Sequence, residues 1–83
     1  MKGISKGLVF DTETATLVVS LKDCEFGDGN IYRTEKGNYF VENLGSDEGH
    51  TLEYLPTDDL EQIISEWDEL GTVIINFDEF EIG

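Results

Sequence analysis

The sequence predicts an α+β domain, in which an antiparallel β-sheet of about four to six strands carries one amphipathic helix on a face. One observation is a helical repeat of apolar residues over 58–70. A second is the set of β-prone runs, separated by polar or Gly-containing links, before and after that repeat. The third is the length of 83 residues, which suits one modest core. We therefore expect residues 1–83 to form a single acidic domain.

The helix predicted over 58–70 has one apolar side. Its apolar residues fall within an arc of about 120° when successive residues are turned by about 100°. They are Leu60, Ile63, Ile64, Trp67 and Leu70. We expect this stripe to face the core, with Trp67 as a core residue and not a recognition anchor. Thr57, after Pro56, is the expected N-cap, and Gly71 is the expected residue after the last turn.

Two hairpins are predicted before the helix. Residues 7–11 and 15–21 are β-prone runs around a polar link, which fits a hairpin turn. Residues 30–35 and 38–43 flank Lys36-Gly37, with Gly where a tight turn needs a positive φ. In that register Tyr32 lies opposite Val41, and Thr34 lies opposite Tyr39. Some of Tyr32, Tyr39, Phe40 and Tyr54 should then face outward.

The remaining segments are predicted more simply. Residues 22–30 and 44–50 read as loops, and 52–55 as a short strand leading into the helix. Residues 72–77 are strongly β-prone. The apolar alternation changes parity between Phe77 and Phe80, so a bulge or break is expected at Asp78-Glu79.

Charge is distributed unevenly along the chain. Residues 1–36 hold six acids and five bases, whereas residues 37–83 hold thirteen acids and no Lys or Arg. The formal net charge is −14. Such a chain lacks the cations that displace counterions from phosphates, so direct binding to nucleic acid or to an anionic membrane is not expected.

The helix carries much of this charge. Six carboxylates lie outside its apolar arc, on Asp58, Asp59, Glu61, Glu66, Asp68 and Glu69. Acids in the first turn favour the helix dipole, but acids in the last turn oppose it. Like-charge pairs three residues apart add a cost of about 0.2–0.5 kcal/mol each. The arrangement fits either a functional anionic surface or a solvated face of an acidic protein.

No residue pattern indicates an enzyme. Cys24 and His50 are the single cysteine and histidine, and neither lies in a motif that would activate a nucleophile. A segment beginning at Asp23 resembles a calcium loop, but its sixth position is Asp28 and its twelfth is Thr34, where Gly and Glu are required. We expect no catalytic residues, no metal site and no cofactor.

The chain should be a soluble, cytoplasmic protein. Its lone cysteine suits a reducing compartment. The N-terminal residues lack the continuous apolar run of a signal peptide, and no stretch is long and apolar enough to span a membrane.

The acidic helix suggests a mimic of nucleic acid. Thirteen helical residues span about 20 Å, a length along which one DNA strand presents about six phosphates. A fixed row of carboxylates at that density could occupy a basic channel of another protein. Supporting acids would come from the flanking segments, at Asp47, Glu48 and Glu53. Asp78, Glu79 and Glu81 would extend the surface if the fold brought them near.

Two segments carry a resemblance to a known group of proteins. They are Asp11-Thr-Glu-Thr-Ala15 and Ile31-Tyr-Arg-Thr-Glu-Lys-Gly-Asn-Tyr-Phe40. Together they resemble a family of small acidic proteins from phages and mobile elements that end in an acidic helix. This chain departs from it by lacking a Gly-rich insert between hairpin and helix and by its extension over 73–82. The resemblance implies an anti-CRISPR protein, acting in the host cell cytoplasm if phage-encoded.

Two functions are therefore carried forward. The first is a non-enzymatic inhibitor that binds a basic nucleic-acid-binding surface, with a CRISPR–Cas effector as the candidate partner. The second is an antitoxin-like or regulatory interaction module that uses an exposed strand edge and aromatic residues. The two differ in their expected salt dependence, which is strong for the first and weak for the second.

Overall fold

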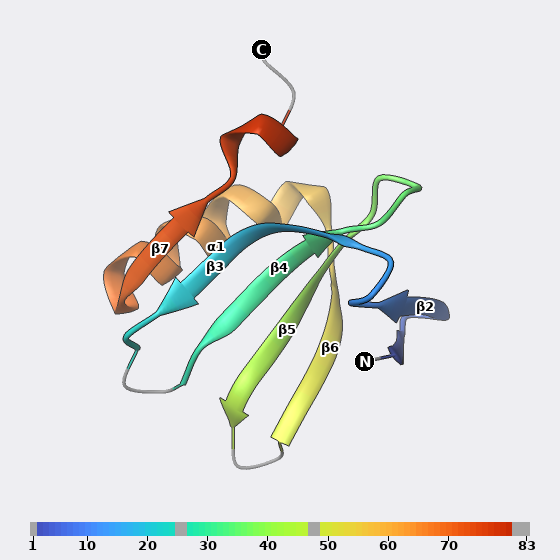
Figure 1. The fold of residues 1–83 in the computed structure, drawn as a ribbon, viewed down its shortest axis with the longest axis horizontal. Helices are drawn as coiled ribbons and strands as arrows, with labels where there is room; N and C mark the ends of the chain where they lie inside the picture. Colours follow the sequence, from blue (N-terminus) through green and yellow to red (C-terminus); the bar gives the residue numbers. More distant parts are fainter. Residues whose placement is uncertain (1, 25–26, 47–48, 81–83) are drawn as a thin grey trace.

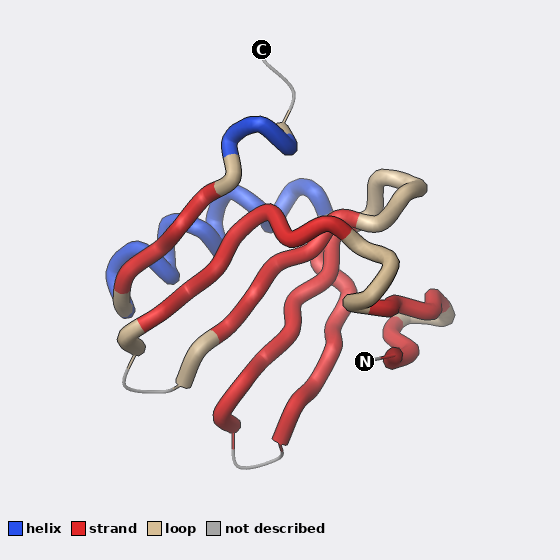
Figure 2. Tube along the Cα trace, in the orientation of Figure 1, coloured by secondary structure: helices blue, strands red, loops and turns tan. Residues whose placement is uncertain are grey.

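A computed structural model describes residues 2–24, 27–46 and 49–80. These residues contain seven strands, one α-helix and one 3₁₀ turn, and their arrangement in space is drawn in Figure 1 and Figure 2. In chain order these are β1 (Lys2–Ser5), β2 (Leu8–Asp11), β3 (Thr16–Lys22), β4 (Gly29–Arg33), β5 (Tyr39–Ser46), β6 (Gly49–Leu55), α1 (Thr57–Leu70), β7 (Thr72–Ile75) and η1 (Phe77–Glu79). No helix in this part of the chain is long and apolar enough to cross a membrane.

Five of the strands form one sheet in the order β6-β5-β4-β3-β7, with every neighbouring pair antiparallel. Helix α1 covers one face of this sheet, on the side of β3 and β7 (Figure 1). The predicted fold class, an antiparallel sheet with one helix on a face, is confirmed.

The N-terminal strands pair differently from the prediction. β2 does not pair with β3 but forms a separate two-stranded sheet with β1, a strand that the sequence did not suggest. Lys6 and Gly7 join them with positive φ angles of 53° and 78°, the conformation of a tight hairpin turn. The polar link still turns the chain, because the amide of Ala15 donates to the carbonyl of Asp11. β3 is thereby directed into the main sheet.

The β4–β5 hairpin is present, but its register is one residue away from the prediction. Tyr32 lies opposite Phe40 and not Val41. The turn spans three residues, 35–37, with Gly37 at a φ of 88°, whereas the predicted turn spans two. The extra residue shifts the pairing of β4 with β5 by one position. Phe40 therefore shares a face with Tyr32, on the side of the sheet away from α1, and it is buried there because Phe10 stacks on it.

The main core lies between the sheet and α1. Its buried members are Val18, Val19, Leu21, Ile31, Val41, Leu55, Leu60 and Trp67. Trp67 and Leu60 are buried as predicted, and Ile63 and Ile64 are partly buried against the same cluster. Leu70 is 47% exposed, contrary to prediction, because α1 ends there and the chain turns into β7.

The helix termini also differ from the prediction. Thr57 is the first helical residue, and no side chain caps the N-terminus; the amide of Asp59 donates instead to the carbonyl of Pro56. Gly71 is extended, with a φ of −171°, so it does not serve as a left-handed residue. Its role is steric, because a Cβ atom there would lie 2.6 Å from the carbonyl oxygen of Lys22.

Several segment boundaries differ too. The expected loop over 44–50 is largely strand, since β5 continues to Ser46 and β6 begins at Gly49. β7 stops at Ile75, and the expected break at Asp78-Glu79 is the 3₁₀ turn η1. Arg33 holds η1 through the backbone carbonyl and the carboxylate of Glu79, the latter at 2.9 Å.

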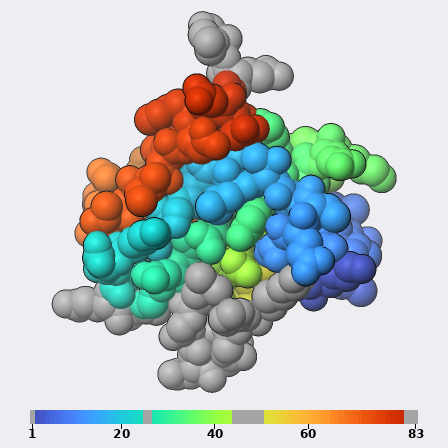
Figure 3. Space-filling model, viewed as in Figure 1, coloured from blue at the N-terminus to red at the C-terminus, as the bar shows by residue number. Residues whose placement is uncertain are grey.

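The sheet face away from α1 carries a second, aromatic and polar cluster. Phe10 of β2 stacks on Phe40, with 4.8 Å between ring centroids, and Phe40 stacks on Tyr32. Beside them the Glu42 carboxylate, only 8% exposed, accepts hydrogen bonds from the Asn30 amide and the Tyr32 hydroxyl. This face is seen in Figure 3, between the β1–β2 hairpin and η1. The β1–β2 hairpin thus packs on a sheet it does not join.

The close approach at Gly71 generates a stability prediction. We expect Gly71→Ala to lower the free energy of unfolding by about 1–3 kcal/mol, because the new methyl group must displace the backbone of Lys22. Gly37→Asn is the control, since space is open around Gly37 and Asn tolerates its positive φ. Chemical denaturation measures both, and an unchanged midpoint for Gly71→Ala would refute the steric role.

The Glu42–Tyr32 contact generates a pH prediction. Burial raises the pKa of Tyr32 above its usual value of 10.0, and the charge of Glu42 and its hydrogen bond raise it further. The neutral phenol is the favoured form, so its contribution to stability is present below pH 10 and is lost as the pH rises through the folded pKa. Glu42→Gln should lower the Tyr32 pKa in an ultraviolet titration, with Tyr32→Phe identifying which of three tyrosines responds. An identical titration in Glu42→Gln would contradict this coupling.

Candidate functional site

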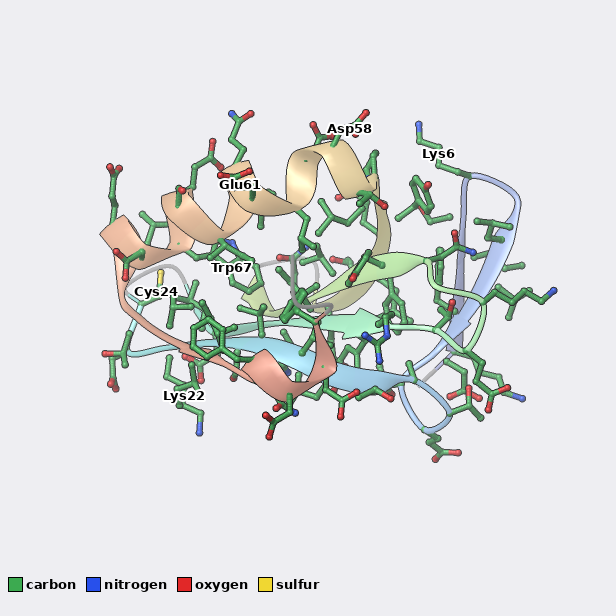
Figure 4. All side chains as sticks on the ribbon, turned by 90° about the horizontal axis from the view of Figure 1, so that it is seen from above. Lys6, Lys22, Cys24, Asp58, Glu61 and Trp67 are labelled. Carbon is green, nitrogen blue, oxygen red and sulfur yellow. The ribbon has the colours of Figure 1, made fainter. Side chains whose placement is uncertain are left out.

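The outer side of α1 is anionic. The six carboxylates predicted to lie there are all on exposed residues, and we call them the acidic helix surface: Asp58, Asp59, Glu61, Glu66, Asp68 and Glu69. Figure 4 shows Asp58 pointing away from the sheet, whereas Trp67 points toward it. The packing of the apolar stripe therefore fixes which way the acids face.

The carboxylates are spread around the outward side of the helix. At about 100° per residue, Asp58 and Glu69 lie opposite the core, and the other four lie on two flanks. Asp59 and Glu66 occupy the flank above β5 and β6, where both line a groove. Glu61 and Asp68 occupy the opposite flank. The acidic helix surface thus presents charge over three directions and not in a single line.

The ion pairs of the described residues do not involve the acidic helix surface. In the part of the chain that the structure describes, two ion pairs form, between Lys2 and Asp11 and between Arg33 and Glu79, and neither involves α1. Within the helix Glu66 accepts a hydrogen bond from the Gln62 amide at 3.3 Å. The amide carries no charge, so this bond adds no counter-charge to the acidic helix surface.

A groove opens beside the helix because α1 is displaced toward β3 and β7. It has a volume of about 590 Å³ and lies between α1 and the β5–β6 side of the sheet. Val41, Leu55, Ile63 and Trp67 contribute apolar lining, and Glu53, Asp59 and Glu66 contribute carboxylates. The remaining lining residues are Lys6, Asn43, Tyr54, Pro56 and Gln62. The groove thus combines an apolar wall with an acidic rim.

The supporting acids named from the sequence have different positions. Glu53 is exposed on β6, opposite Val41, and so shares the groove with two helix acids. Asp47 and Glu48 lie outside the described residues, as does Glu81. Glu79 pairs with Arg33 and does not extend the acidic helix surface as a free charge. Among the flanking acids that the structure describes, Glu53 lines the groove beside the helix.

The sequence also drew attention to a calcium-like loop beginning at Asp23 and to the residues Cys24 and His50. No group of three His, Cys, Asp or Glu side chains among the residues described could hold a metal ion. In the segment resembling a calcium loop, the Asn30 side chain bonds instead to Ser20 and Glu42. Cys24 is partly buried against the core. The structure does not describe the side chain of His50, so the Cys24–His50 pair is not placed.

Sequence reasoning missed the groove and Lys6 at its edge. Lys6 precedes the acidic helix by about fifty residues and belongs to a hairpin that was not predicted. No spacing rule connects it to Asp59 or Glu66. The uncharged Gln62 side chain, which no charge pattern singles out, donates a hydrogen bond to Glu66. Comparison of the chain with protein-family models, curated proteins and solved structures finds no match.

The dipole of α1 generates a prediction about stability. Glu69→Lys should raise the free energy of unfolding by about 0.5–1 kcal/mol, because it places a cation in the last turn and removes a like-charge pair with Glu66. Asp58→Lys makes the same change of charge in the first turn and should lower stability, by a smaller amount, because losing the like-charge pair with Glu61 partly offsets the unfavourable dipole interaction. Thermal and urea unfolding test this, and a stabilising effect of both variants would mean that overall charge, not the dipole, governs stability.

Proposed function

We propose that this protein is a non-enzymatic inhibitor that occupies a basic nucleic-acid-binding surface of another protein. The observation that carries the proposal is the acidic helix surface: six exposed carboxylates on one element, with no ion pair to it among the described residues. A protein that used acids only for solubility would gain stability from cations in the last helical turn, and α1 has none.

The dimensions of α1 fit this role. Its fourteen residues span about 21 Å, which equals about six phosphate steps along one DNA strand. When a cationic groove of the partner binds the helix, the anions held at that groove are released into solution. This is the counterpart of the cation release that drives proteins onto DNA. Attraction between the acidic helix surface and the cationic groove also raises the association rate. Because the carboxylates are held by a packed helix, they need little ordering on binding.

A guide-loaded CRISPR–Cas effector is the partner we propose, on the basis of the sequence resemblance to small acidic proteins of phages and mobile elements. Such effectors hold the guide–target duplex in a positively charged channel and recognise its backbone. An acidic helix of this length would compete for part of that channel. The outcome would be loss of target DNA binding without cleavage or modification of the effector.

The second candidate function is an interaction module that docks through the sheet edge. β7 is an outer strand of the main sheet, and its exposed Ile74 and the following Phe77, 74% exposed, are apolar. The aromatic residues expected to assist are less available, since Phe40 is buried. Binding of this kind would depend on Phe77 and weakly on salt.

The proposal predicts a charge-dependent interaction. Guide-loaded Cas effectors should bind the protein, and binding should weaken by at least about a hundredfold between about 50 and 500 mM salt. Asp68→Lys and Glu69→Lys should each weaken binding about tenfold, because each turns an attraction into a repulsion. Competition with labelled target DNA, followed by fluorescence anisotropy, measures the effect.

The controls separate the two candidate functions. Glu35→Lys makes the same change of charge at the tip of the β4–β5 hairpin, away from α1, and should change affinity little. Phe77→Ser should have no effect if the acidic helix surface binds. Affinity that is flat with salt, unaffected by Glu69→Lys and lost in Phe77→Ser would refute the mimic and support edge docking.

A further inference from the structure

We propose that the groove between α1 and the β5–β6 side of the sheet receives an arginine side chain of the partner. This inference rests on the proposed function and deepens it. The acidic helix surface would attract a cationic partner from any direction, whereas the groove supplies one place of defined shape where a single side chain can be anchored.

The apolar lining suits the stem of a long side chain. Val41 and Leu55 come from the sheet, and Ile63 and Trp67 come from the helix. All four belong to, or pack against, the main core, so this wall is rigid. A simple metal cation or a phosphate would gain nothing from such a surface. The three methylenes of an arginine would bury against it while the charged end stays at the rim.

The rim suits the charged end. Glu53 projects from β6, and Asp59 and Glu66 lie on the facing flank of α1. Glu66 is already held by the Gln62 amide, so its carboxylate is oriented before binding. Carboxylates on two sides of a groove match the planar, forked guanidinium, which donates several hydrogen bonds in fixed directions. A lysine would fill the same space but offers a single point charge, so arginine is the occupant we infer.

Lys6 provides a test of the sign of the occupant's charge. It lies at the turn of the β1–β2 hairpin (Figure 4) and lines the groove from there. It makes no ion pair among the described residues. An incoming cation would be repelled by Lys6, and an incoming anion would be attracted. Removing Lys6 should therefore tighten binding of a cationic ligand and weaken binding of an anionic one.

A hexa-arginine peptide is the probe, and the single tryptophan, which lines the groove, is the reporter. Titration at low salt should change Trp67 fluorescence saturably, and hexa-lysine should bind more weakly. Glu53→Gln should weaken hexa-arginine binding about two- to fivefold more than Glu35→Gln, its charge-matched control at the hairpin tip. Lys6→Asn should tighten binding more than Lys36→Asn, which makes the same change of charge outside the groove.

The outcomes distinguish this inference from the proposed function. Trp67 fluorescence that does not change, or paired variants with equal effects, would overturn the groove as an anchor. The acidic helix surface would still stand if salt and Glu69→Lys weakened binding. Conversely, hexa-arginine binding that alters Trp67 fluorescence, together with effector binding that salt and Glu69→Lys leave unchanged, would refute the mimic but retain the groove. Weaker binding of the effector to Lys6→Asn would show that the partner group in the groove is not a cation. A fluorescence change on concentrating the protein alone would identify a second copy as the occupant.

Discussion

The packing of Trp67 against the sheet determines how α1 is oriented and which of its side chains face solvent. The ring lies so close to Gly29 of β4 that a Cβ atom at that position would come within 3.1 Å of it. Glycine there lets a large aromatic side chain approach the strand and bury its surface, which anchors the C-terminal part of α1. Once that contact is made, the apolar stripe faces inward, the carboxylates face solvent, and the displacement of α1 toward β7 leaves the groove open.

The same packing explains how a helix with unfavourable electrostatics persists. Acids in the last turn oppose the dipole, and like charges repel along both flanks. These costs are fractions of a kcal/mol each, whereas burying a large apolar side chain contributes about 1.5–3 kcal/mol. Leu60 and Trp67 are buried, so tertiary packing outweighs the charge repulsion. The protein can therefore hold an anionic surface that an isolated helix would not support.

Local sequence patterns predicted the positions of the helix and strands better than they predicted which strands pair. The repeat from Leu60 to Trp67 has one dominant period, and it correctly placed the helix, its buried side and its outward carboxylates. Strand pairing depends on turn geometry and on distant residues. A three-residue turn at Gly37 shifted one register, and the turn at Lys6 drew β2 away from β3. The groove could not be predicted, because Lys6, Val41 and Glu66 meet only through that tertiary arrangement.

The position of β7 in the sheet affects how the chain folds. β3 has two neighbours, one supplied by the next strand in the chain and the other by residues 72–75, more than fifty positions after Val19. Closing so long a loop slows folding relative to local pairings. Until the last strand arrives, one side of β3 presents unpaired amides and carbonyls to other chains. On the ribosome, the sheet would therefore stay incomplete and prone to association until residues 72–75 emerge.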